Sequence, residues 1–314
     1  MAVTGGNAAF EERLDRLRTD ALETAVPSRT AAGYYGLPLL KPPVWKWMIP
    51  VYFFVGGLAG MSAVIAGAAL LRSDLALARA AMLQAAAGAA VSTVLLVWDL
   101  GRPARFLHML RVFKLQSPMS LGSWILTFFG AAAAAGWLLL LLDSGGASHG
   151  LAGTAVAASA VLGAFLATYT GALLAATAVP AWYLHRGVLP VHFGVAGLGS
   201  AAGLLELLGH DAPALHAIGY AAAAVQTLLL IWLEVRRHGV ADRALRTGRS
   251  GLIARAGESL EGPVALVLRV AGTTRAAAAV FLLGALVSRF GWLAAGRASA
   301  LDPEAVLDAQ RRKS

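Results

Sequence analysis

The sequence predicts an all-α, polytopic membrane protein with about eight transmembrane helices in two four-helix bundles. Of its 314 residues, 58% are hydrophobic and only 14% are charged, whereas soluble domains carry about 25% charged residues. Several apolar runs reach the ~20 residues that a helix needs to cross the hydrocarbon core of a bilayer. These runs are continuous and do not alternate with polar residues, which disfavours a β-barrel.

Seven apolar runs are long enough to cross the membrane as helices. They lie at about 47–71, 79–98, 120–142, 152–179, 189–208, 213–233 and 276–295. A further helix is expected at 251–275, where the apolar run is interrupted by Arg255, Glu258, Glu261 and Arg269. The basic tail after the last crossing favours a return to the cytoplasm and hence an even number of crossings. This seventh helix in chain order is therefore expected to be short or partly interfacial.

The positions of these predicted helices divide the chain into four parts. They are an N-terminal amphipathic arm and strap at 1–46, a first four-helix bundle at 47–179, a second bundle with the weak seventh helix at 180–296, and a cytoplasmic tail at 297–314. The arm places apolar residues at helical spacing, and prolines then stiffen an extended strap. It is expected to lie on lipid headgroups or on a partner subunit. Because residues 1–46 contain no apolar h-region, no cleaved signal peptide is expected.

An internal similarity links the two halves of the chain. The stretches IPVYFFVGGLA from Ile49 and LPVHFGVAGLG from Leu189 share six of eleven positions at an offset of 140. Their crossings are four helices apart and therefore run in parallel. The match predicts a tandem duplication of a four-helix unit, with a chance match in a biased composition as the alternative.

Basic residues gather in every second connection of the predicted topology. The formal net charge is +9, and the alternate connections hold little more than Arg72 and Arg79. With a cytoplasmic N-terminus, this distribution satisfies the positive-inside rule. The charge therefore indicates orientation in the membrane and not nucleic-acid binding. A multi-pass protein of the cell inner membrane, in contact with lipids, is expected.

Redox metal centres are not expected within this chain. It has no cysteine, which excludes disulfides and cysteine-bound iron–sulfur clusters. A transmembrane b-type haem needs two axial ligands that face each other inside a bundle. The histidines instead fall in loops or, like His192 and His216, near the starts of helices. We therefore expect no transmembrane haem and no metal site in this chain, with a peripheral haem near a helix end as the alternative.

Three polar residues within apolar runs are candidates for chemistry. Asp99 ends the second crossing, and Arg102 can pair with it as an ordinary salt-bridged helix terminus. Tyr169 lies mid-helix, where a phenol either lines a polar cavity or finds a purely structural partner. Glu206 is a candidate for proton transfer, with a carboxylate that snorkels to the nearby interface as the alternative.

Four stretches together resemble the polysulfide reductase membrane-subunit family, often called NrfD-like. They are KPPVWKWMIPVYFFVGGLAG from Lys41, WDLGRPARFLHMLRVFKLQSPMSLGSWIL from Trp98, YTGALLAATAVPAW from Tyr169 and RFGWLAAGRASALDPEA from Arg289. The similarity runs in order from about Tyr34 to Pro303, and its second stretch is highly specific. The chain departs from the family at the weak seventh crossing.

The resemblance implies an eight-helix, quinone-reactive subunit that holds no redox cofactor of its own and is not a complete enzyme alone. It implies a ferredoxin-like iron–sulfur subunit as partner, connected in turn to a molybdopterin catalytic subunit that acts on formate, a sulfur compound or a similar substrate. Electrons would be exchanged between the iron–sulfur subunit and the membrane quinone/quinol pool, either menaquinone or ubiquinone.

Carried over residue by residue, the resemblance places Asp99, Tyr169 and His108 at the quinone. Asp99 would also transfer protons, because quinone reduction takes two electrons and two protons. The charged loop and the strap are expected to dock the partner through Arg102, Arg105, Arg111, Lys114, Tyr34 and Tyr35. A secondary transporter and a purely structural anchor are the rival functions. Transporters show broken helices at matching positions, but Pro50 and Pro190 lie at helix starts and break nothing.

Overall fold

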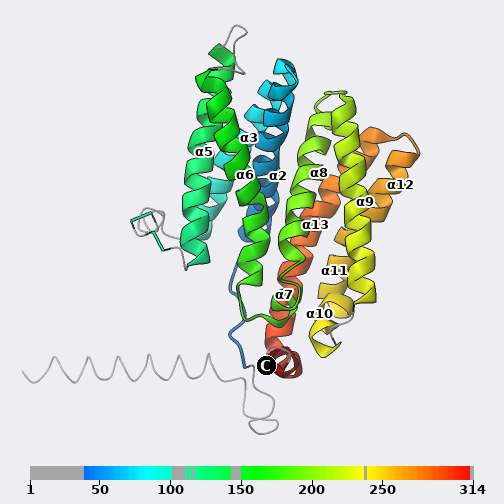
Figure 1. Ribbon diagram of the computed structural model, residues 1–314. Coiled ribbons are helices and arrows are strands. Elements are labelled where there is room, and N and C mark those ends of the chain that lie inside the picture. The colour runs from blue at the N-terminus through cyan, green and yellow to red at the C-terminus, as the bar shows by residue number, and fades with distance from the viewer. Residues whose placement is uncertain are drawn as a thin grey trace, which may run out of the picture. The chain divides into compact units, whose positions relative to one another are not determined.

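The computed structural model describes residues 39–100, 110–111, 113–114, 117–142, 150–236 and 239–311 (Figure 1). The long helices are α2 (Met48–Leu71), α3 (Leu75–Asp99), α5 (Pro118–Leu142), α6 (Leu151–Ala175), α8 (Leu189–Leu207), α9 (Pro213–Val235) and α13 (Thr274–Leu301). The shorter elements are α7 (Pro180–Tyr183), η3 (Gly239–Asp242), α10 (Arg243–Arg246), α11 (Gly248–Ser259), the π-helical turn η4 (Leu260–Val264), α12 (Ala265–Val270) and α14 (Pro303–Arg311). The N-terminal arm lies outside the described residues.

The described residues confirm an all-α, polytopic membrane fold. Six helices are long and apolar enough to cross a membrane: α2, α3, α5, α6, α9 and α13. The 19-residue α8 and the continuous helical segment Gly248–Val270 pack beside them. The first bundle consists of α2, α3, α5 and α6, and the second consists of α8, α9, Gly248–Val270 and α13 (Figure 1).

The seventh segment, expected to be short or partly interfacial, is a continuous helical segment from Gly248 to Val270, and it is not among the six helices that are long and apolar enough to cross a membrane. Three of its four interrupting charges, Glu258, Glu261 and Arg269, are buried inside the second bundle, whereas Arg255 is exposed. Pro263 lies within this segment, where proline removes a backbone hydrogen-bond donor and its ring crowds the preceding turn. The π-helical turn Leu260–Val264 surrounds that proline. The charges that lower the hydropathy of this segment therefore lie mostly inside the bundle, and hydropathy alone does not separate inward-facing from lipid-facing residues.

Small residues allow the helices of the first bundle to approach closely. A Cβ added at Gly60 of α2 would lie 2.2 Å from the carbonyl oxygen of Gly163 in α6, and a Cβ at Gly163 would lie 2.3 Å from the oxygen of Gly60. In lipid there is no hydrophobic drive between helices, so close backbone packing is a principal source of association. The glycines therefore fix the distance between α2 and α6.

Equivalent positions of the internal repeat contact one another between α2 and α8. The rings of Phe53 and Phe193 lie 6.1 Å apart, and a Cβ added at Gly197 would lie 2.7 Å from the carbonyl oxygen of Gly57. In each pair, the two residues are 140 positions apart in the sequence, which is the offset of the repeat. Two parallel copies related by a two-fold axis contact each other in this way, residue against equivalent residue. The two bundles thus meet along the matching helices of the repeat.

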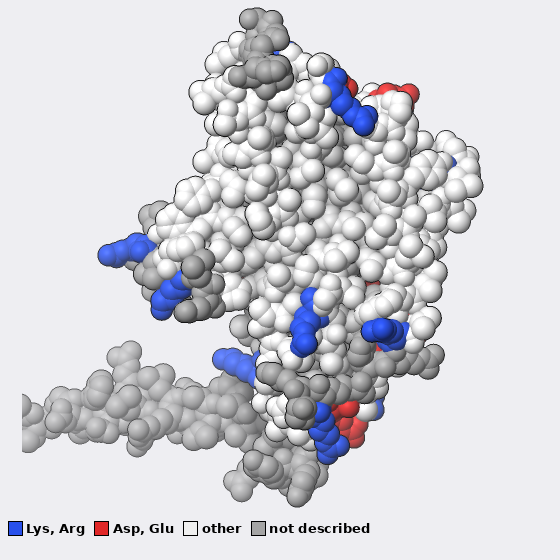
Figure 2. Space-filling view, viewed as in Figure 1, with Lys and Arg blue, Asp and Glu red and all other residues white. Residues whose placement is uncertain are grey.

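One end of the helices, here called the basic end, carries the exposed residues Lys46, Lys114, Arg186, Arg243 and Arg249. On the face shown in Figure 2, Lys and Arg gather there, and the middle of the helices is free of them. The strap at 39–47 crosses this end: Trp45 stacks on Trp182 of α7 with ring centroids 5.5 Å apart. The Arg297 side chain donates a hydrogen bond to the carbonyl of Pro43 at 3.2 Å. The strap therefore ties the first bundle to α7 and α13.

Candidate functional site

A cavity of about 360 Å³ opens at the basic end of the first bundle. The strap and all four helices of that bundle contribute to it. Its walls are mainly apolar, and its polar lining residues are Lys46, Tyr52, Asp99, Ser123 and Tyr169. Ligand sites in proteins have volumes of roughly 300–1,000 Å³ with mostly apolar walls and a few converging polar groups. The cavity has the size and the lining of such a site.

Tyr169 is held in a defined position at this cavity. Its side chain is 8% exposed, and its hydroxyl donates a hydrogen bond to the carbonyl of Pro118 at the start of α5. Its ring packs against Gly122, where an added Cβ would lie 2.3 Å from the phenol oxygen. A hydroxyl that donates one hydrogen bond still accepts others. The phenol is therefore anchored at one side and remains able to bind a ligand.

Asp99 reaches the same cavity from another helix. It is the last residue of α3, is partly exposed, and lines the cavity together with Tyr169. A carboxylate at the mouth of a cavity near the membrane surface keeps contact with water and can exchange protons. The structure thus brings together Asp99 and Tyr169, which are 70 positions apart in the sequence.

Sequence reasoning missed Tyr52, which also lines this cavity. It belongs to α2, is 3% exposed, and lies near Tyr169 and Phe53. One available signal was its place in the repeat, where position 52 carries tyrosine and the equivalent position 192 carries histidine. A polar residue at the same point in both copies of an apolar motif indicates an inward-facing position.

The other predicted site residues lie elsewhere or cannot be placed. His108, Arg102, Arg105, Tyr34 and Tyr35 fall outside the described residues. Arg111 and Lys114 are exposed in the connection between α3 and α5, as a docking role requires.

Glu206 does not reach the cavity of the first bundle. It is buried near the other end of the second bundle, where its two carboxylate oxygens accept hydrogen bonds from Arg269 at 3.0 and 2.8 Å. Its burial excludes the alternative of a carboxylate that snorkels to the interface. Among the described residues, no group of three His, Asp or Glu side chains is arranged to hold a metal ion.

A comparison with protein families identifies the chain. The family model described as "Polysulphide reductase, NrfD" matches residues 39–238. The match includes the strap, both helices of the repeat contact and every residue that lines the cavity. No curated protein matches the chain. Because the matched region spans well over half of its length, the chain belongs to the NrfD family of polysulphide reductase membrane subunits.

Proposed function

We propose that this protein is the quinone-reactive membrane subunit of a respiratory oxidoreductase complex. One observation carries the proposal: Asp99 and Tyr169, from different helices, line a single cavity with apolar walls at the basic end. A quinone headgroup is a flat, largely apolar ring with two carbonyl acceptors. Apolar walls bind its faces, and a few polar groups orient its oxygens.

The lining residues fit this chemistry. Trp45, Ile49 and Phe53 supply apolar surface to the cavity, whereas Tyr52 and Tyr169 supply hydroxyl groups. The quinone would accept two electrons and two protons in becoming a quinol. Because the Tyr169 hydroxyl donates its proton to the Pro118 carbonyl, its oxygen would accept a hydrogen bond from a hydroxyl group of the quinol, and its contact with Gly122 would fix the direction of that bond.

Asp99 would transfer the protons between the cavity and the basic end. Its partial exposure keeps it in exchange with water while it lines the cavity. A positioned carboxylate within hydrogen-bond reach acts as general acid and base, which contributes roughly 10²–10⁴-fold to the rate. Menaquinone and ubiquinone carry the same pair of carbonyl groups, and the cavity suits both.

The partners would dock at the basic end. A ferredoxin-like iron–sulfur subunit, connected to a molybdopterin catalytic subunit, would cover the loop with Arg111 and Lys114 and the strap at 39–47. The cavity opens beside that strap, so the electron path from the partner to the quinone would be short. By the positive-inside rule the basic end would face the cytoplasm of a cell with the protein in its inner membrane.

The alternative function, that of a secondary transporter, is less well supported by the helix geometry. Pro50 is the third residue of α2 and Pro190 the second of α8, so neither interrupts its helix. The π-helical turn Leu260–Val264 lies in the second bundle, whereas its counterpart in the first bundle, α5, is a regular α-helix.

The test uses the intact complex purified from its native membranes with Asp99→Asn and Tyr169→Phe in this subunit. Both substitutions preserve shape and remove a proton-transfer or hydrogen-bonding group. We expect quinone turnover to fall about 10²-fold in Asp99→Asn and by a smaller factor in Tyr169→Phe, with subunit composition unchanged. Wild-type turnover in both variants would mean that the subunit acts only as a structural anchor for its partners.

A further inference from the structure

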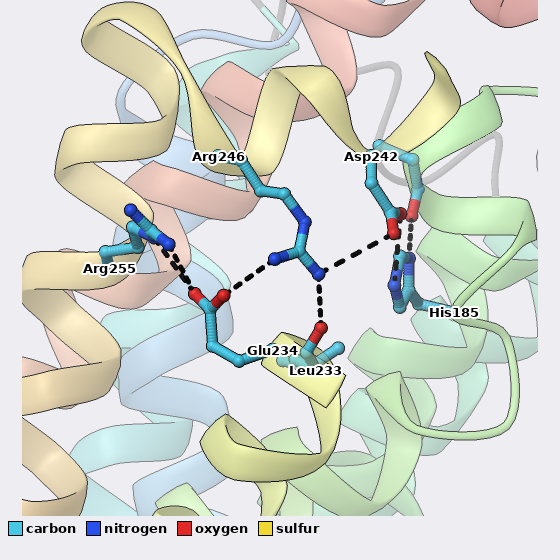
Figure 3. Close-up of polar contacts among 7 residues, drawn as sticks. His185, Leu233, Glu234, Asp242, Arg246 and Arg255 are labelled. Atoms are coloured by element: carbon cyan, nitrogen blue, oxygen red, sulfur yellow. Dashed lines mark hydrogen bonds and ion pairs between the residues drawn. The ribbon is translucent and has the colours of Figure 1, made fainter. Parts of the chain in front are cut away.

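A cluster of ionic side chains closes the basic end of the second bundle (Figure 3). We call it the ionic clasp and define it as His185, Glu234, Asp242, Arg246 and Arg255. Arg246 and Arg255 both bind Glu234, at 2.6 and 2.7 Å, and His185 lies 3.5 Å from Asp242. Glu234 and Arg255 are in contact with solvent, whereas His185 and Asp242 are buried. The clasp therefore leads from the surface into the bundle.

Glu258 lies next to the ionic clasp, on the side of the bundle interior. It is buried, and it lines a cavity of about 20 Å³ with His185, Asp242, Arg246 and Arg255. A cavity of this size holds one water molecule. Its Oε1 has no hydrogen-bond partner among the described residues. Glu258 therefore lies between the clasp and the interior, next to space for a water molecule.

One helical turn further along, Glu261 and His192 face each other in the interior. Glu261 is 0% exposed, and neither of its oxygens has a hydrogen-bond partner within the described ranges. His192 Nε2 lies 3.6 Å from Glu261 Oε1, which is too far for a direct hydrogen bond. The Ser288 hydroxyl beside Glu261 donates instead to the carbonyl of Ala285.

The hydrogen bonds of Gln226 determine which nitrogen of His192 carries its proton. The Gln226 amide nitrogen donates to the backbone carbonyl of His192 at 3.0 Å, so its amide oxygen is the atom facing His192 Nδ1, 2.8 Å away. That oxygen accepts only, and Nδ1 must therefore donate. In the neutral ring, Nε2 then has a free lone pair directed to the Glu261 carboxylate.

Two acceptors thus face each other with no donor between them. A single added proton resolves this conflict, because it turns either group into a donor for the other. The charged groups around the pair are Arg289 from α13 and Glu258 from α11. Arg289 donates to the carbonyl of Phe193 and to Ser288, and its charge offsets that of Glu261.

The pair is isolated from the opposite end of the bundle. Along α8, His192 and Glu206 are separated by about 21 Å of helix at 1.5 Å per residue. The residues between them include no titratable side chain. At that end Glu206 binds Arg269 through both oxygens and also lies 3.0 Å from Nδ1 of the partly exposed His216. The groups at that end are therefore separated from the pair by a stretch of α8 without titratable side chains, whereas Glu258 lies one helical turn from Glu261 on the side of the basic end.

We propose that Glu261 and His192 form a proton-binding site in the second bundle, which exchanges its proton with the basic end through Glu258 and the ionic clasp. The proton enters from water, and the carboxylate–imidazole pair gains one positive charge without any other bond change. The site is separate from the quinone cavity and does not depend on the proposed quinone reaction. In the repeat, His192 is the equivalent of Tyr52, so both bundles place a functional polar group at the same position.

Infrared spectroscopy of the full chain, reconstituted in lipid films, tests the site. Protonated carboxyl groups absorb separately from carboxylates, and a titration of the wild-type protein is expected to show such a band. Glu261→Gln removes it, Glu261→Asp shifts it, and the exposed control Glu304→Gln leaves it unchanged. A titration without a protonated carboxyl band, or an unchanged band in Glu261→Gln, would overturn the proposal. Because Gln mimics the protonated acid in shape, the variant is expected to fold, and Glu261→Asp gives an independent reading.

Transfer of the film from water to D₂O tests whether protons reach the site through Glu258. In the wild-type protein the band shifts as the bound proton exchanges with deuterium. Glu258→Met preserves side-chain bulk but removes the carboxyl group next to the small cavity, and we expect the exchange to become about tenfold slower or more. Equal exchange rates in Glu258→Met and wild type would show that protons do not pass through Glu258.

Discussion

Gly122 in α5 supports the ring of Tyr169 in α6. A Cβ added at Gly122 would lie within 2.4 Å of three atoms of the phenol, much closer than any real side chain approaches another. Gly122→Ala is therefore expected to displace the Tyr169 ring and break its hydrogen bond to the carbonyl of Pro118. We expect quinone turnover by the intact complex to fall at least as far as in Tyr169→Phe.

Gly130→Ala is the matched control, since it makes the same change on the same helix. A Cβ at Gly130 would lie 3.7 Å from the Ala89 side chain, an ordinary van der Waals contact. Its turnover should equal that of the wild-type protein. Normal turnover in Gly122→Ala would mean that the position of Tyr169 is unimportant for the reaction.

The sequence was sufficient to predict the helices of the first bundle and the two central residues of its cavity. Continuous apolar runs identified α2, α3, α5 and α6, because inward and lipid-facing surfaces in that bundle are both apolar. Asp99 and Tyr169 were recognisable as polar groups in apolar surroundings. Their convergence on one cavity was not predictable from spacing, because it depends on how α3 and α6 pack.

Close packing of α2 against α6 should depend on Gly163. Gly163→Ala forces a Cβ to within 2.3 Å of the carbonyl oxygen of Gly60, and overpacking of this kind typically costs about 1–3 kcal/mol. The expected result is a lower midpoint of thermal unfolding for the detergent-solubilised protein. Gly67→Ala, on the α2 side of the same helix contact, serves as the control because its Cβ would lie 3.5 Å from that of Ala160 in α6. If the two variants unfolded at the same temperature, the close contact would not limit stability.

The ion pair of Glu206 and Arg269 should be important for stability. Both side chains are buried, and Arg269 also packs over Gly219, where an added Cβ would lie 2.0 Å from its guanidinium carbon. Removing one partner of a buried pair leaves an uncompensated charge, which costs about 3–5 kcal/mol. We therefore expect Glu206→Gln to lower the thermal midpoint strongly. The nearby Asp211→Asn should have little effect, because that carboxylate is 89% exposed.

The double variant Glu206→Gln/Arg269→Met separates this role from proton transfer. It removes both charges, and replacing a buried ion pair by residues of similar volume is often neutral for stability. Stability is expected to recover relative to Glu206→Gln alone. A stable single variant with reduced quinone turnover would instead support the proton-transfer role predicted for Glu206 from the sequence.

Second-bundle residues show where sequence reasoning reaches its limit. Glu258, Glu261 and Arg269 reduce the hydropathy of their segment, so they weakened the prediction of a helix that the structure shows in full. Arg269 pairs with Glu206, and Glu261 faces His192; both of these facing residues belong to α8. Within one segment of sequence, charges that face other helices inside a bundle cannot be distinguished from charges that face water.

The orientation of the protein can be tested with single cysteines, since the chain contains none. Gly187 lies in the exposed turn between α7 and α8 at the basic end, with open space around an added side chain. Ala271 lies in the exposed turn between α12 and α13 at the opposite end. The positive-inside rule places the first turn in the cytoplasm and the second outside it. A membrane-impermeant thiol reagent added to intact cells should therefore label Ala271→Cys and not Gly187→Cys, whereas permeabilised cells should show both labels. The reverse pattern in intact cells would place the basic end, the quinone cavity and the docking surface outside the cytoplasm, which requires a partner exported in folded form.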